Sequence, residues 1–584
     1  MTMLKSLLCY MLLGTALAID YCPLYGPQYP PPINLHQNSI FNAATNNITS
    51  TLNADLPSDG TINTTSFAIQ IFSTEDSAEN PLFKYYYTSP ATQNATVGVT
   101  HIDGDTVFRI GSLSKVWTLY TWLLRADGYK YFNRPITDFI PELRRVAHQQ
   151  KRNQTKSEDT VDFAQWGEIT VGDLAGQMAG IARDYGLNDL AVTTPLYALE
   201  ALGFSALTCA EIPACGSGGT CNRSELFRGL PSSHPTFPTS HSPAYSNAAF
   251  QILSYALEKI TNSKFDSLLT DSIINPLNLS RTSISAPPAQ YGVIPGTEAS
   301  SYWNFPFGEE APTGGYYASI NDLSTVSRSI LANTLLSPAV TRRWLKPITH
   351  TSSLDFAVGQ PWEIFSYQEG RTIDLFAKMG NIVAYGATMG LSPDHNAGFS
   401  VLVAGPNPAL ASSTLTMISD LIAKLLITAL EAAAKDEAKK FTGTYVDTTP
   451  NTNSSITLVI DSGPGISVTS WINNGVNMLE TVKTFYQIPT LADVSVRLYY
   501  TTLDHRVESG STFIGFRAVM GSLAESNTPP AYQGPIGSSC HSWQLIDSVI
   551  YGNIGLDKFL VEVNEAGQVV SIQPRALRTT LTKQ

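Results

Sequence analysis

The chain has 584 residues, of which 43% are hydrophobic and 10% aromatic, so it can bury large cores and should divide into more than one domain. Only 14% of the residues are charged, with 36 Lys and Arg against 48 Asp and Glu, which gives a formal net charge of −12. This balance, without a long run of one sign, argues against a surface that binds nucleic acid.

The segment 1–18 is typical of a secretory signal peptide. Lys5 is followed by an apolar stretch over 7–13 and by a small-x-small cleavage site, Ala16-Leu17-Ala18. The apolar stretch is too short to span a bilayer, and no later segment reaches the roughly 20 apolar residues of a spanning helix. We therefore expect a secreted protein without a membrane anchor. Seven N-x-[ST] sequons are consistent with a glycoprotein, at Asn47, Asn63, Asn94, Asn153, Asn222, Asn278 and Asn453.

Five cysteines remain after removal of the signal peptide, and an odd number leaves at least one thiol unpaired. Cys209, Cys215 and Cys221 lie in one Gly-rich stretch, where an oxidising compartment favours one local disulfide. A bond between Cys22 and Cys540 is a further hypothesis, since it would link the N-terminal segment to the C-terminal part of the chain.

Residues 19–65 are rich in Pro, Asn, Thr and Ser, which predicts an extended N-terminal arm with no core of its own. Regular structure is expected to start at Ser66. Short segments rich in aromatic and β-branched residues predict strands at 66–72, 82–88 and 106–110. From Ser112 the apolar residues follow helical spacing until Asp127-Gly128, which predicts a helix.

Further along, the sequence predicts helices at 247–261 and 319–332, strands at 374–379 and 398–404, and a long amphipathic helix at 415–440. After residue 440, strand-like segments recur between turn signals with little helical periodicity. The expected organisation is a signal peptide at 1–18, an N-terminal extension at 19–65, a domain of helices and strands at 66–440 and an all-β domain at 441–584.

Several chemistries are absent from the sequence. The nine His are scattered, and there is no H-E-x-x-H, no C-x-x-C, no P-loop and no dinucleotide fingerprint. We therefore expect neither a metal nor another cofactor. The lack of G-x-S-x-G also removes the simplest α/β-hydrolase interpretation.

One S-x-x-K motif, from Ser112 to Lys115, directly follows a predicted strand and opens a predicted helix. Residues three apart share a helix face, so an amine would meet the serine hydroxyl one turn later. This pairing matters because a serine is a poor nucleophile until a neighbouring base takes its proton. The plainer alternative is that Ser112 caps the helix and Lys115 is solvated.

Two further triplets follow in the chain. Tyr245-Ser246-Asn247 begins the predicted helix at 247–261, and Lys378-Met379-Gly380 lies in the predicted strand at 374–379. Each is uninformative by itself, because Asn and Ser often cap helices and a lone strand lysine usually faces solvent. Their order and their structural context give them weight.

Together the three triplets resemble the serine β-lactamase, penicillin-binding-protein and esterase superfamily, in particular its class C-like branch, in which S-x-x-K, Y-x-N and K-T-G line one cleft. FRIGSLSKVWT, ITVGDLAGQMAGI and PTGGYYASINDL also follow local patterns of that branch in the right order. The resemblance covers roughly 66–430. With its signal peptide and C-terminal domain, the whole chain resembles the secreted β-lactamase-like proteins of filamentous fungi.

The resemblance implies an α+β fold, in which an antiparallel sheet is flanked by helices and carries a helical subdomain, followed by the all-β domain. It makes Ser112 the acylated nucleophile and Lys115 the amine that helps to deprotonate it. Tyr245 would relay the proton to the leaving group and later activate water, as a general base and acid.

The same resemblance assigns substrate binding to Asn247, Lys378, Gly380 and Asn381. Asn247 would orient the acyl side of the substrate, and Lys378 would supply positive charge that favours a tyrosinate and anionic substrates. The two backbone N–H groups of the oxyanion hole map to Ser112 and to Asn381, the residue after K-x-G.

The chain departs from the family at Met379, which replaces the threonine of K-T-G. In β-lactamases that hydroxyl helps to hold the substrate carboxylate, so its loss argues against efficient antibiotic degradation.

The leading hypothesis is a secreted serine hydrolase that cleaves a small-molecule ester, amide or lactam through an acyl-enzyme on Ser112. One alternative is an acyltransferase or hydrolase that acts on a fungal secondary metabolite, and another is a catalytically inert binding glycoprotein.

Overall fold

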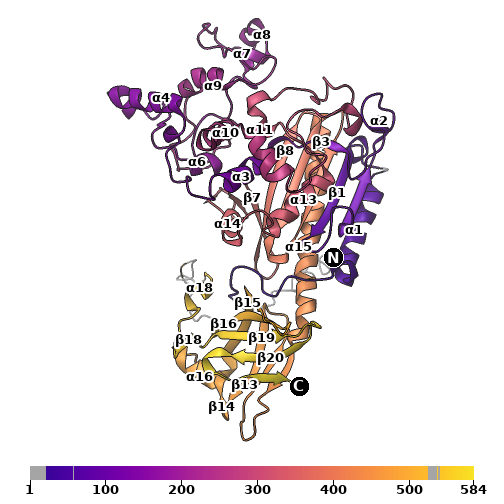
Figure 1. Ribbon diagram of the computed structural model, residues 1–584, viewed down its shortest axis with the longest axis vertical. Helices are drawn as coiled ribbons and strands as arrows, with labels where there is room; N and C mark the ends of the chain where they lie inside the picture. The colour runs from indigo at the N-terminus through magenta and orange to yellow at the C-terminus, as the bar shows by residue number, and fades with distance from the viewer. Residues whose placement is uncertain (1–21, 57, 524–535, 537–538) are drawn as a thin grey trace, which may run out of the picture. The chain divides into compact units, whose positions relative to one another are not determined.

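The computed structural model describes residues 22–56, 58–523, 536 and 539–584, so the signal peptide predicted at 1–18 lies outside the described residues. The described chain divides into two compact units (Figure 1). We call 33–367 with 374–429 the mixed unit, and 22–32 with 368–373 and 430–584 the strand-rich unit. None of the helices in the described part combines the length and the apolarity needed to cross a membrane.

The mixed unit is built on an eight-stranded sheet with the order β2-β1-β10-β9-β8-β7-β6-β5, whose central strands pair antiparallel (Figure 1). Every residue of β1, β9 and β10 is buried, as expected for strands that are covered on both faces. The strands are β1 (Ser66–Ser73), β2 (Phe83–Tyr87), β5 (Thr349–His350), β6 (Phe356–Val358), β7 (Glu363–Gln368), β8 (Thr372–Ile382), β9 (Tyr385–Ser392) and β10 (Ala397–Ala404).

Helices flank this sheet and form a helical subdomain, and a two-stranded ladder joins β3 (Val107–Arg109) to β4 (Tyr317–Ser319). The helices are α1 (Ser39–Asp55), α2 (Pro90–Gln93), α3 (Ser114–Arg125), α4 (Pro141–Arg152), α5 (Gln154–Glu158), α6 (Val171–Ala175), α7 (Leu190–Thr193), α8 (Leu196–Ala201), α9 (Arg223–Gly229), α10 (Ala248–Thr261), α11 (Phe265–Leu269), α12 (Ala311–Gly314), α13 (Ile320–Leu331), α14 (Pro338–Trp344) and α15 (Pro408–Glu437).

Helices α13 and α15 cover opposite faces of the sheet. The Gln70 side chain of β1 donates to Asn321 of α13 at 2.6 Å, whereas Ser419 of α15 lies 3.1 Å from the hydroxyl of Thr388 in β9. Gln70 stands in register with Met389, the residue after Thr388, through β10. Because successive side chains of a strand point to opposite faces, the two helices lie on different sides. This is the expected antiparallel sheet flanked by helices.

The strand-rich unit contains, in its described part, a nine-stranded sheet that a β12–β13 pairing closes on itself like a barrel. Its core includes Phe441, Trp471, Phe516 and Phe559, and helix α16 (Met478–Phe485) packs on β13 and β15. The strands are β11 (Gly443–Val446), β12 (Ser455–Val459), β13 (Ile466–Asn473), β14 (Val476–Asn477), β15 (Val494–Arg506), β16 (Thr512–Ser522), β19 (Lys558–Val563), β20 (Val569–Pro574) and β21 (Leu581–Lys583). The fold class predicted from the sequence is confirmed.

The N-terminal segment differs from its prediction. The expectation of an extended arm over 19–65 is wrong for Ser39–Asp55, which form helix α1. The side chain of Asn38 caps this helix by accepting hydrogen bonds from Ile40 N and Phe41 N. Phe41, Thr45, Ile48 and Leu52 are buried, at spacings of three and four residues. The helical period was present in the sequence, but the many Asn and Thr residues around it suggested a loop.

The structure contains one local disulfide in the Gly-rich stretch, whose pairing the sequence left open, and the hypothesised bond between the two ends of the chain. Cys22 pairs with Cys540 inside the strand-rich unit, and Cys215 pairs with Cys221 in the mixed unit. Cys209 keeps a free, exposed thiol. In the strand-rich unit the N-terminal segment is held further by Gln28, whose side chain accepts a hydrogen bond from Gly465 N at 2.8 Å.

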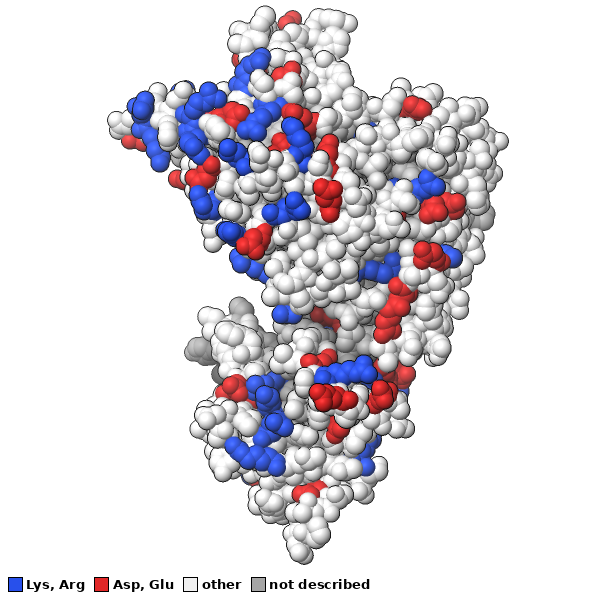
Figure 2. Space-filling model, viewed as in Figure 1, with Lys and Arg blue, Asp and Glu red and all other residues white. Residues whose placement is uncertain are grey.

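Charged side chains lie mainly on the surface. On the face drawn in Figure 2, Lys and Arg gather over α4, with Asp and Glu between them. Lysine is rarely fully buried unless it is paired. Among the described residues, the only buried lysines are Lys115, with 0% exposure, and Lys378, with 2%. Both belong to the motifs that the sequence singled out.

Candidate active site

Ser112 lies in a tight turn between β3 and α3. Gly111 has φ +50° and opens the 3-10 turn Gly111–Leu113, from which α3 continues. A Cβ on Gly111 would lie 2.9 Å from the amide nitrogen of Asn381, so this position requires glycine for both its backbone conformation and its close approach. The turn thereby holds the half-buried Ser112 against the end of β8.

Lys115 lies one helical turn after Ser112 and is fully buried. Its Nζ donates to Ser112 Oγ at 3.2 Å, to Asn247 Oδ1 at 2.7 Å and to the carbonyl of Thr313 in α12 at 2.6 Å. The three protons of an ammonium group thus have three acceptors. Burial lowers the pKa of Lys115, and the neighbouring Tyr245 opposes only part of that effect.

Tyr245 approaches the same serine from the segment before α10. Its hydroxyl donates to Ser112 Oγ at 2.7 Å. Burial acts to raise the pKa of this phenol, but the positive charges of Lys115 and Lys378, helped by its hydrogen bonds, bring the pKa below its usual value of 10. The two ammonium groups lie 4.9 and 5.6 Å from the centre of the ring. The site therefore makes it easier to form a phenolate next to the serine hydroxyl than it is for an ordinary tyrosine.

Lys378 in β8 has an acidic partner that the sequence did not indicate. Its Nζ donates to Glu363 Oε1 at 2.5 Å and to the carbonyl of Met379 at 2.7 Å, while Met379 N donates to Glu363 Oε2 at 2.9 Å. Burial acts to lower the pKa of Lys378, but the Glu363 carboxylate and the nearby Tyr245 together outweigh that effect and raise the pKa. Lys378 therefore stays charged beside Tyr245, but its charge is already paired.

Asn247 is engaged by protein groups at both ends of its amide. Its Oδ1 accepts from Lys115, and its Nδ2 donates to Asp184 Oδ1 at 2.8 Å. The substrate-orienting role of Asn247 stays a prediction, and in this structure its amide oxygen holds the ammonium group of Lys115. Asp184, whose pKa is raised by burial, thus supports the lysine through Asn247.

Gly380 and Asn381 bring the backbone of β8 against the serine turn. A Cβ on Gly380 would lie 2.1 Å from the carbonyl oxygen of Ile110 and 2.8 Å from the amide nitrogen of Ser112. Only a residue without a side chain allows this approach. The segment that carries the Asn381 amide is therefore held next to the Ser112 amide, as a pair of oxyanion donors requires.

A cavity of about 570 Å³ opens beside Tyr245. Its walls include Glu363 at the start of β7 with the preceding Trp362, His350 of β5, and His241 from the segment before α10. Trp362 is at the same time a buried residue of the hydrophobic core of the mixed unit. In the described part of the chain, no cluster of three or more His, Cys, Asp or Glu side chains is placed to hold a metal ion.

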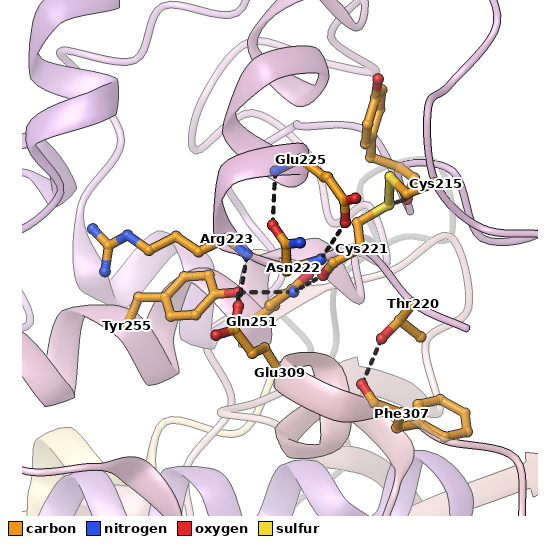
Figure 3. The surroundings of a disulfide bond; sticks show 11 residues. Cys215, Thr220, Cys221, Asn222, Arg223, Glu225, Gln251, Tyr255, Phe307 and Glu309 are labelled. Carbon is orange, nitrogen blue, oxygen red and sulfur yellow. Dashed lines mark hydrogen bonds between the residues drawn. A yellow bond between two sulfur atoms is a disulfide. The ribbon is translucent and has the colours of Figure 1, made fainter. Parts of the chain in front are cut away.

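The Cys215–Cys221 disulfide lies beside segments that support this site (Figure 3). The sulfur of Cys221 is 3.2 Å from the carbonyl oxygen of Tyr185, the residue after Asp184. Gln251, one turn along α10 from Asn247, donates to the carbonyl of Cys221 at 2.8 Å. The disulfide loop therefore holds both segments that position Asn247.

The same loop contacts the segment that leads into α12. Helix α12 contains Thr313, whose carbonyl accepts the hydrogen bond from Lys115. Thr220 donates its hydroxyl to the carbonyl of Phe307, and Arg223 N donates to Glu309 Oε2 at 2.6 Å (Figure 3). The hydroxyl of Tyr255 donates to the same carboxylate oxygen at 2.9 Å. The disulfide loop thus contacts the segment after Asp184, helix α10 and the segment before α12, all of which support the site.

Replacing Cys215 and Cys221 by serine is expected to destabilise the mixed unit by about 2 kcal/mol, because the unfolded chain loses a short closed loop. The measurement is the urea midpoint of unfolding of the oxidised protein. Cys209→Ser is the matched control, since it removes an exposed free thiol and should change stability by less than about 0.5 kcal/mol. A double variant as stable as the control would show that the hydrogen bonds alone hold the loop.

The sequence did not reveal Asp184, Thr313 or Glu363. Asp184 and Glu363 belong to no motif, and Thr313 contributes only its backbone carbonyl. Glu363 becomes visible only when β7 is placed beside β8 in the sheet. Each of these contacts depends on tertiary pairing, for which a single sequence carries no spacing signal.

Comparisons with known proteins give the family of this chain. A family model described as "Beta-lactamase" matches residues 83–420, more than half of the chain. The chain belongs to the beta-lactamase family. A second model, described as "Beta-lactamase-like-like, C-terminal domain", matches 433–584.

Relatives of this beta-lactamase family member include a "Beta-lactamase-like protein" from Arthroderma benhamiae, 29% identical with 98% of each chain covered. Another is "Probable hydrolase M10" from a Phoma species, 26% identical over 78% of this chain and 74% of the relative. Among solved structures, a class C beta-lactamase from Rhodobacter sphaeroides is similar with 16% identity and a TM-score of 0.44, covering 66% of this chain and 99% of that one. The family and the relatives' names support a hydrolase.

Proposed function

We propose that this beta-lactamase family member is a secreted serine hydrolase that cleaves an ester or amide of a small molecule through an acyl-enzyme on Ser112. The observation that carries the proposal is the pair of hydrogen bonds at Ser112 Oγ, from Tyr245 at 2.7 Å and from Lys115 at 3.2 Å. A nucleophilic serine needs an adjacent base, and these two groups have pKa values below their usual ones.

In the acylation step, the phenolate of Tyr245 accepts the proton of Ser112 while Oγ forms a bond to the substrate's carbonyl carbon. The carbonyl electrons move to its oxygen, which would accept hydrogen bonds from the backbone N–H groups of Ser112 and Asn381. When this oxyanion collapses, the bond to the leaving group breaks. The leaving group takes the proton from Tyr245, and the acyl group stays on Ser112.

Deacylation uses the same groups in reverse. Tyr245 accepts a proton from water as the water oxygen attacks the acyl carbon, and Ser112 Oγ leaves with that proton. If an alcohol replaces the water, the same steps give acyl transfer, which is the second reaction that the site supports. Lys115 and Lys378 stabilise the phenolate form of Tyr245 in both half-reactions.

Secretion is part of the proposal. The disulfides Cys22–Cys540 and Cys215–Cys221 support it, because disulfides persist in oxidising compartments such as the exterior of the cell. The segment 1–18 has the pattern of a cleaved signal peptide. Mass spectrometry of the protein from culture medium would test both the cleavage and the glycosylation of the sequons.

Exposure to a fluorophosphonate is expected to add one phosphonyl group to the protein, at Ser112. Intact-mass spectrometry of the deglycosylated protein measures the adduct, and peptide mapping gives its position. A parallel panel of short-chain activated esters and β-lactams would identify the acyl class by turnover. If no reagent modifies the folded protein, the proposal fails and an inert binding glycoprotein takes its place.

A further inference from the structure

Lys378 has no free charge to offer a ligand. Its side chain is 2% exposed, and its ammonium group donates to both Glu363 Oε1 and the carbonyl of Met379. A substrate carboxylate could take up this ammonium only by displacing Glu363 from its ion pair with a buried lysine, which is unfavourable because the displaced carboxylate would lose its partner. Met379 also lacks the hydroxyl that could hold a carboxylate at this position.

Glu363 occupies the place that such a carboxylate would take. Its side chain is 25% exposed, and it lines the 570 Å³ cavity next to Tyr245. Its second carboxylate oxygen accepts from Met379 N, so the acid is fixed by two partners on β8. An incoming anion would therefore meet a fixed negative charge at this wall of the cavity.

No other wall of the cavity supplies positive charge. The described residues that line it include no Lys or Arg, and Glu363 is their only acid. The guanidinium of Arg183 lies nearby, 4.7 Å from the centre of the Tyr245 ring. Arg183 Nε is in turn 3.6 Å from a carboxylate oxygen of Asp184. The cavity thus has one permanent charge of its own, and that charge is negative.

We propose that Glu363 sets the charge selectivity of this cleft, which takes substrates whose group next to the scissile bond is neutral or cationic and rejects those that carry a carboxylate there. This inference rests on the proposed hydrolase function and names its substrate class. It replaces the expectation, drawn from Lys378, of a site that favours anionic substrates. Lys378 keeps its charge when it is paired with Glu363, and its Nζ lies 5.6 Å from the centre of the Tyr245 ring. It can therefore stabilise the phenolate of Tyr245 without binding a substrate anion.

Three phenyl acetates with meta substituents of different charge test this selectivity: the carboxylate and the carboxamide, which are similar in size, and the trimethylammonium ester. Each kcat/KM is divided by the ester's rate of alkaline hydrolysis, to remove differences in leaving-group reactivity. We expect the wild-type protein to prefer the carboxamide and the trimethylammonium esters over the carboxylate by about tenfold or more, the effect of one nearby charge. Equal values for all three esters would overturn the proposal.

Glu363→Gln is expected to reduce that preference to about threefold or less, mainly by raising kcat/KM for the carboxylate ester, because Lys378 then lacks a negative partner. Glu480→Gln is the matched control. It removes an acid that pairs with Lys483 at 2.7 Å in the strand-rich unit, and it should leave all three values unchanged. A Glu363→Gln protein that folds and keeps the wild-type preference would contradict the role of Glu363.

Direct binding separates failure of this inference from failure of the proposed function. Benzoate, benzamide and phenyltrimethylammonium can be titrated against the wild-type protein by NMR, which requires no turnover. A protein that hydrolyses none of the esters but binds benzoate at least tenfold more weakly than benzamide would lack the proposed activity and keep the charge selectivity. Benzoate bound as tightly as benzamide would overturn the selectivity, whether or not the protein is active.

Discussion

Replacing Ser112 by alanine should lower kcat/KM for an activated ester by about 10⁴-fold or more, because the acyl-enzyme can no longer form. The fold should be retained. Lys115 keeps its bonds to Asn247 and to the Thr313 carbonyl, so the loss of one partly buried hydroxyl should change stability by about 1 kcal/mol or less. Initial rates with a p-nitrophenyl ester and the urea midpoint of unfolding measure the two effects.

Ser114→Ala is the matched control for this variant. Ser114 has 0% exposure, and its hydroxyl donates to the carbonyl of Gly111 at 2.7 Å and accepts from Tyr316 N at 3.2 Å. Its loss should destabilise the protein by about 1 kcal/mol but leave the fluorophosphonate adduct in place. If Ser114→Ala abolished labelling while Ser112→Ala did not, the nucleophile would have been assigned to the wrong serine.

Much of the mixed unit could be predicted because its strands and helices carry strong periodic signals. The segments at 66–72 and 247–261 form β1 and α10 almost as expected. The long helix predicted at 415–440 instead begins at Pro408, since proline is well accommodated in the first turn of a helix. Helix α16 was missed in a region rich in strands, where its eight residues give a weak periodic signal.

At the site, the motif residues could be predicted from the sequence, but the acidic partners of those residues could not. The residues of the three motifs meet at Ser112 through contacts of Lys115 and Tyr245, while Lys378 faces the Tyr245 ring. Motif order could predict this convergence because the family supplies the template. The partners of Lys378 and Asn247 could not be predicted, because Glu363 and Asp184 reach them only through the folded arrangement. Glu363 changes the substrate that we expect, because it pairs with Lys378. Asp184 positions Lys115 through Asn247.

Tyr245→Phe should lower kcat/KM by about 10³-fold, because it removes the atom that exchanges protons with Ser112 but keeps the ring. The ring contacts with Lys115 and Arg183 remain, so the urea midpoint should stay close to that of the wild type. In the wild-type protein the rate should rise with pH through the pKa of Tyr245, which lies below the usual value of 10, because the deprotonated phenol is the active form. The pH profile of kcat/KM should lose this rising limb in Tyr245→Phe.

Lys115 and Lys378 should affect the rising limb of the pH profile of kcat/KM differently. Burial lowers the pKa of Lys115, whereas the pKa of Lys378 is raised because Glu363 and Tyr245 together outweigh the effect of burial. Lys378 therefore remains charged over the whole range in which Tyr245 titrates, and Lys378→Met should move the rising limb to higher pH. Glu363→Gln should move it to lower pH, because the variant lacks a negative charge near the phenolate while Lys378, whose pKa Tyr245 also raises, keeps its proton. Shifts of the limb in the same direction for both variants would contradict an electrostatic link from Glu363 through Lys378 to Tyr245.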